Sequence, residues 1–88
     1  MLTAGAARAS IEPPLPHDLQ GFVRRPVSAT GHTPGDPLQV TGAVFEDDGR
    51  GVVVLAADLA GVDTEAADRI RAAVADALPV DAADVLIN

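Results

Sequence analysis

Residues 38–55 read LQVTGAVFEDDGRGVVVL, and two β-type runs meet there at one Asp-Gly pair. Apolar residues alternate with polar or small ones as far as Val44, whereas the second run, from Val52 to Leu55, is apolar throughout. Glycine accepts the positive φ of a tight turn, so Asp48-Gly49 predicts an antiparallel hairpin over about residues 38–58. The uninterrupted apolar run predicts a central strand that is buried on both faces of its sheet.

The residues after the hairpin predict a crossover helix and a return strand. Asp63-Thr64 is a helix N-cap pair, and Pro79 ends the helical pattern. Apolar residues recur between them at helical spacing, at Ala67, Ile70, Val74 and Leu78, while Arg69, Arg71 and Asp76 lie off that stripe and are expected to face water. Val85-Leu86-Ile87 predicts another buried strand. Strand, helix and strand in this order predict a right-handed crossover that joins two parallel strands.

The front of the chain predicts one more strand and a long connection. Apolar and polar residues alternate between Thr3 and Glu12, and Pro13-Pro14 ends any pairing. From Pro13 to Pro37 the composition turns to Pro, Gly, His, Arg, Ser and Thr without an apolar period, which predicts a loop of about 25 residues. The fold class expected is α/β in the mixed α+β sense, with a partial mixed sheet.

Composition excludes several classes of function. The 88 residues carry 13 acidic side chains and 6 arginines, a net charge of −7, so nucleic acid is not an expected partner. The absence of cysteine excludes disulfides, thiolate nucleophiles and cysteine-ligated zinc. No apolar run approaches the roughly 20 residues that cross a bilayer, and the N-terminus lacks a basic segment ahead of an apolar one. We therefore expect neither a transmembrane segment nor an export signal.

Five pieces of the sequence, in this order and spacing, resemble the N-terminal end of the catalytic domain of the neutral/alkaline, non-lysosomal ceramidase family. They cover essentially the whole chain and are Gly5-Ala6-Ala7 leading to Ile11-Glu12-Pro13-Pro14, Leu19-Gln20-Gly21-Phe22, Gly31 through Asp36-Pro37-Leu38, Val54 through Gly61, and Asp84-Val85-Leu86-Ile87. The resemblance implies that residues 1–88 are an incomplete N-terminal segment of one such domain. It implies a lipid amide, such as ceramide, as the substrate of the full-length protein.

The family is one of zinc-dependent amidohydrolases, which split the N-acyl bond of ceramide into a sphingoid base and a fatty acid. In these enzymes a zinc-activated water attacks the carbonyl that the metal polarises. The family's Thr-His-Thr-His-Ser-Gly-Pro segment follows the strand that Val85 to Ile87 resembles. The catalytic and zinc-binding residues are therefore expected just after Asn88, and the 88-residue chain alone is expected to be inactive and to bind no stoichiometric zinc.

The chain departs from the family at two places. Three residues separate His32 from Asp36-Pro37-Leu38, where the family has a compact Gly-x-His-Asp-Pro-Leu element, and Thr41-Gly42-Ala43 stands where an Arg-Ala pair is common. These differences leave the substrate and its acyl chain open.

His32, Asp36 and Asp58 are the candidates for the periphery of an active site. The resemblance places the neighbourhood of His32 and Asp36 at the active-site end, although a solvated loop histidine is the more common case. Asp58 follows a predicted buried strand, and the carboxyl ends of strands are where α/β proteins place functional groups. The competing interpretation is structural: Asp58 accepts hydrogen bonds from the loop that leads to Gly61.

Two other functions compete with the hydrolase. A non-catalytic fragment or interaction module would need a partner or a missing C-terminal part, and would self-associate through an open sheet edge. The segment AADRIRAAVADALPVDAADV also resembles the first helix and loop of an acyl carrier protein. The phosphopantetheine-bearing serine is absent after it, and the β-rich front half contradicts an all-helical carrier.

Overall fold

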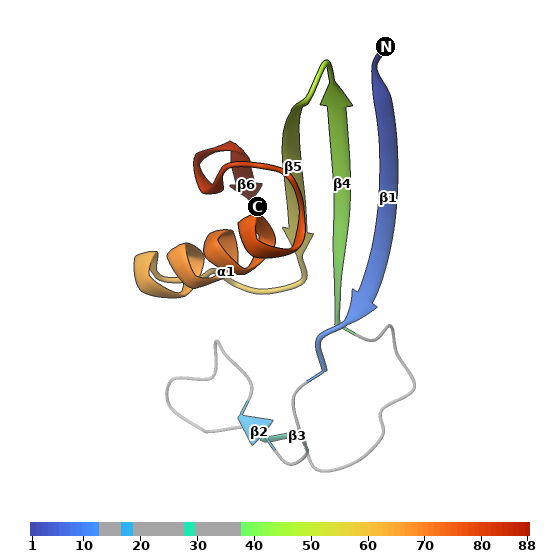
Figure 1. Cartoon of the computed structure of the whole chain (residues 1–88). Coiled ribbons are helices and arrows are strands. Elements are labelled where there is room, and N and C mark those ends of the chain that lie inside the picture. The colour runs from blue at the N-terminus through green and yellow to red at the C-terminus, as the bar shows by residue number, and fades with distance from the viewer. Residues whose placement is uncertain (13–16, 19–27, 30–37) are drawn as a thin grey trace.

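The structure, a computed structural model, describes residues 1–12, 17–18, 28–29 and 38–88. One helix and a four-stranded mixed sheet form the main body (Figure 1). The strands lie in the order β1-β4-β5-β6, so the hairpin β4-β5 occupies the middle. The elements are β1 Thr3–Ser10, β4 Gln39–Asp47, β5 Arg50–Ala57, α1 Thr64–Ala77, the short 3₁₀ turn η1 Ala82–Asp84 and β6 Val85–Ile87.

The predicted hairpin is confirmed, and its turn has the expected geometry. Asp47 and Arg50 are the last paired residues, which leaves a two-residue connection. Both connecting residues have positive φ, 50° for Asp48 and 79° for Gly49. A two-residue turn with positive φ at both positions matches the right-handed twist of the flanking strands, which is why an Asp-Gly pair suits it.

The front of the chain forms the predicted strand β1, which pairs antiparallel with β4. Because the strand ends at Ser10, it is two residues shorter than the predicted range that reached Glu12. Most of the predicted long loop lies outside the described residues. Its described parts are a two-stranded antiparallel pairing of β2, His17–Asp18, with β3, Ser28–Ala29.

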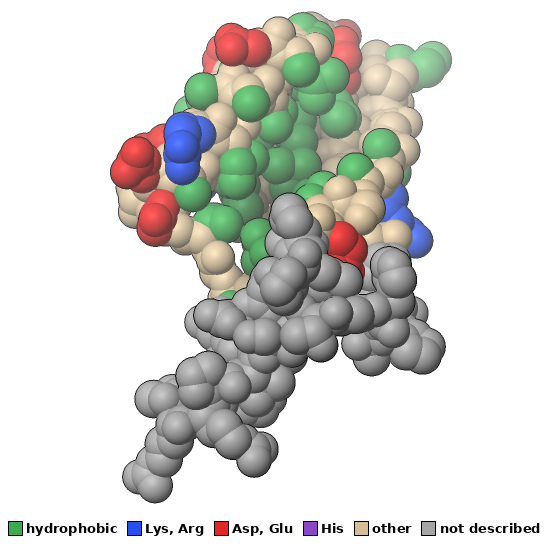
Figure 2. Space-filling model, turned by 90° about the horizontal axis from the view of Figure 1, so that it is seen from below, with side chains coloured by type: hydrophobic (Ala, Val, Ile, Leu, Met, Phe, Trp, Pro, Cys, Tyr) green, Lys and Arg blue, Asp and Glu red, His purple; other side chains and the backbone are tan. Residues whose placement is uncertain are grey.

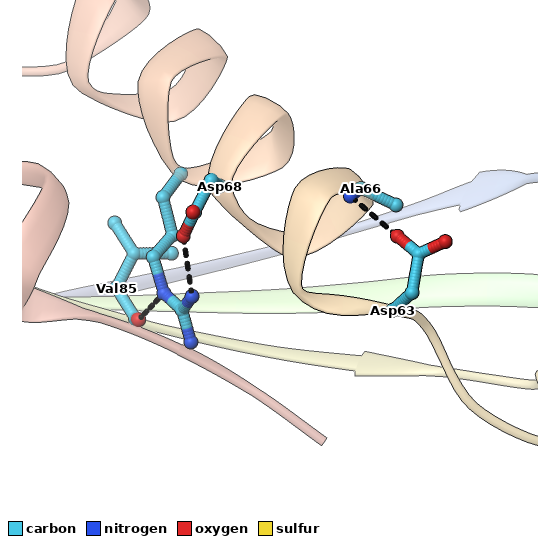
Figure 3. Close-up of polar contacts among 5 residues, drawn as sticks. Asp63, Ala66, Asp68 and Val85 are labelled. Carbon is cyan, nitrogen blue, oxygen red and sulfur yellow. Dashed lines mark hydrogen bonds and ion pairs between the residues drawn. The ribbon is translucent and has the colours of Figure 1, made fainter.

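The crossover helix begins and ends as predicted. One carboxylate oxygen of Asp63 accepts a hydrogen bond from the Ala66 N–H at 2.7 Å, which caps the first turn (Figure 3). Helical residues end at Ala77, two positions before Pro79. The prediction that Arg71 faces water is correct only in part. Its side chain is 34% exposed, and its Nε donates to the Val85 carbonyl at 3.1 Å.

Burial divides the sheet into two unequal faces. The buried hydrophobic residues among those described are Val53 of β5, Ala67 of α1 and Val85 of β6. Val53 is paired with Val85 in the sheet, and it lines a hollow together with Val74 and Leu78 of α1. The view from below in Figure 2 shows hydrophobic side chains gathered between the helix and the sheet. Val52, next to Val53 but on the other side of the strand, is 39% exposed. The prediction that the run from Val52 to Leu55 is buried on both faces is therefore wrong.

The return strand β6 is parallel to β5, as predicted, with Val53 opposite Val85 and Leu55 opposite Ile87. It lies at one edge of the described sheet, because β5 is its only neighbour there. Val85 is 2% exposed, but Leu86 is 57% exposed. The predicted buried strand is thus an edge strand with one covered face.

Candidate functional site

The candidate site is the end of the sheet where β1, β5 and β6 finish and β4 begins. Two carboxylates there bind consecutive backbone N–H groups at the start of β4. A Glu12 oxygen accepts from the Leu38 N–H, and Oδ2 of Asp58 accepts from the Gln39 N–H at 3.0 Å. The Asp58 N–H also donates to the Gln39 carbonyl at 2.9 Å. Both side chains therefore fix the point at which the chain enters the central hairpin.

Asn88 joins this end of the sheet through its backbone. Its N–H donates to the Leu55 carbonyl at 2.7 Å, and its own carbonyl accepts from the Ala57 N–H at 2.9 Å. These bonds continue the parallel pairing of β5 with β6 by one residue. As a result, Asp58 and Asn88 leave the sheet at the carboxyl ends of neighbouring parallel strands, where α/β folds place their ligand sites.

Only one of the three predicted site residues lies in the described part of the chain. Asp58 is at the carboxyl end of β5, as expected, whereas His32 and Asp36 lie outside the described residues. Asp58 forms structural hydrogen bonds, but its side-chain donor is Gln39 of β4 and not the loop that leads to Gly61. The interpretation that Asp58 forms structural hydrogen bonds is therefore supported, but the partner that it predicted is wrong.

Glu12 was not among the predicted site residues. The available signal was its position, since a carboxylate that follows a strand and precedes Pro13-Pro14 stands at a strand end just as Asp58 does. Its partner, Leu38, is 26 positions away in the chain, so no local pattern identifies the contact.

The described residues do not suit a zinc ion. Among residues 1–12, 17–18, 28–29 and 38–88, no three His, Asp or Glu side chains come together as a metal site. Both carboxylates at the candidate site accept backbone hydrogen bonds. The chemical role that this arrangement supports is structural, because the hydrogen bonds of the two carboxylates hold backbone segments in position.

Two of the hollows on the described surface do not include these carboxylates. One, of about 330 Å³, is lined by small and apolar residues that run from Gly5 and Ala7 of β1 to Val74 and Leu78 of α1. The other, of about 290 Å³, lies at the hairpin end and includes Arg50, Asp81 and Asp84. The first has the apolar lining that suits a hydrocarbon group. Neither hollow includes Asp58 or Glu12.

No helix in the described part of the chain is long and apolar enough to cross a membrane. Comparisons of the chain with models of known protein families, with curated proteins and with solved structures find no match.

Proposed function

We propose that this chain forms the N-terminal framework of a zinc-dependent amidohydrolase of the neutral ceramidase type, acting on a lipid amide. The observation that supports the proposal is the parallel pairing of β5 with β6, which brings Asp58 and Asn88 to the same end of neighbouring strands. In α/β folds that end is where substrates and cofactors bind. In the family that the sequence resembles, the zinc-binding histidine segment follows the strand equivalent to Val85–Ile87.

Within this proposal the residues of the chain position that segment, and the reaction itself belongs to residues outside it. Zinc, when bound by the histidine segment, supplies Lewis-acid chemistry to the amide carbonyl. Glu12 and Asp58 hold the start of β4 against the ends of β1 and β5, through the Leu38 and Gln39 N–H groups. The backbone of Asn88, bound to β5 on both sides, sets the direction in which the next residues leave the sheet.

The test begins with the codons that follow Asn88 in the gene. They are expected to encode a His-x-His segment within a few residues, and the product that contains it is expected to release fatty acid from an N-acyl sphingosine in a zinc-dependent way. Asp58→Ala in that product is expected to lower kcat about tenfold or more, because a misplaced group of this kind loses catalytic orientation. Asp76→Ala, an exposed helix position, is the matched control. The proposal would be contradicted by a reading frame that continues past Asn88 without the histidine pair. It would also be contradicted by a longer product that binds zinc but shows no amidase activity.

A second function, that of an interaction module, is favoured by the face of the sheet opposite α1. Phe45 is 43% exposed and its cross-strand partner Val52 is 39% exposed on that face, and isolated soluble domains seldom leave neighbouring large apolar side chains uncovered. Two measurements distinguish these functions. An interaction module is expected to associate in solution without zinc, and it is expected to show no amidase activity.

A further inference from the structure

We draw no further inference here: the strongest candidate, the exposed apolar patch of Phe45 and Val52 on the face of the sheet opposite α1, carries none because nothing in the structure shows what covers it.

Discussion

Two adjacent valines on β5 provide the sharpest test of which face of the sheet is covered. Val53 is 2% exposed beneath α1, and Val52 is 39% exposed on the face of the sheet opposite α1. Because the preference of a strand for valine over alanine mostly reflects packing and burial of the side chain, the difference between the two variants reports how each face is covered. Val53→Ala is expected to destabilise the fold clearly more than Val52→Ala.

The magnitudes follow from what each substitution removes. Truncating valine deletes two carbon groups worth about 0.8 kcal/mol each when fully buried, or about 1.6 kcal/mol at Val53. The cavity left between helix and sheet adds about 1 kcal/mol, which gives about 2.5 kcal/mol in total. At Val52 about 60% of the transfer energy applies and no closed cavity forms, because the side chain is 39% exposed, so the loss is about 1 kcal/mol.

The assay is urea unfolding of both variants, followed by circular dichroism. The expected difference of about 1.5 kcal/mol corresponds to roughly a tenfold difference in the unfolding equilibrium constant. Equal losses would mean that both faces are covered alike. A larger loss for Val52→Ala would refute the placement of α1.

Gly51→Ala is expected to destabilise the fold by about 1 to 3 kcal/mol, since an added Cβ would lie 2.7 Å from Cγ1 of Val80. Gly5→Ala, whose added Cβ meets nothing within 4 Å, is expected to be neutral or slightly stabilising in the same thermal melt; similar losses at both positions would contradict the packing around Gly51. Arg71→Met is expected to cost about 1 kcal/mol in urea unfolding, because it removes the hydrogen bond from Nε to the Val85 carbonyl while keeping an apolar stem. Arg69→Met, on the exposed side of the same helix, is the control, and an equal loss there would show that the contact contributes nothing.

Local features were predictable because their causes are local. The turn at Asp48-Gly49 needs two residues that accept positive φ, and the sequence supplies them between two β-type runs. The cap at Asp63 needs a carboxylate three residues before the Ala66 N–H that it binds. The parallel strand after the helix follows from chain order alone. Each of these predictions uses residues that lie close together in the sequence.

The candidate site was only partly predictable. Asp58 was identified from its place after an apolar strand, but its partner Gln39 is 19 positions away. Glu12 was missed for the same reason, since its contact with Leu38 spans 26 positions. Hydrogen bonds across such separations depend on the strand register. The donor and acceptor come together only when β1, β4 and β5 are paired.

The amino-acid sequence determined the elements and their order, because turns, caps and hydrophobic periodicity act within a few residues. Only the tertiary structure decided which face of the sheet receives the helix. A run such as Val52 to Leu55 is apolar on both sides, and its sequence is the same whether one face or both are covered. The helix α1 covers one face, so Val53 is buried while Val52 is left exposed on the face opposite α1, and β6 becomes an edge strand in the described sheet.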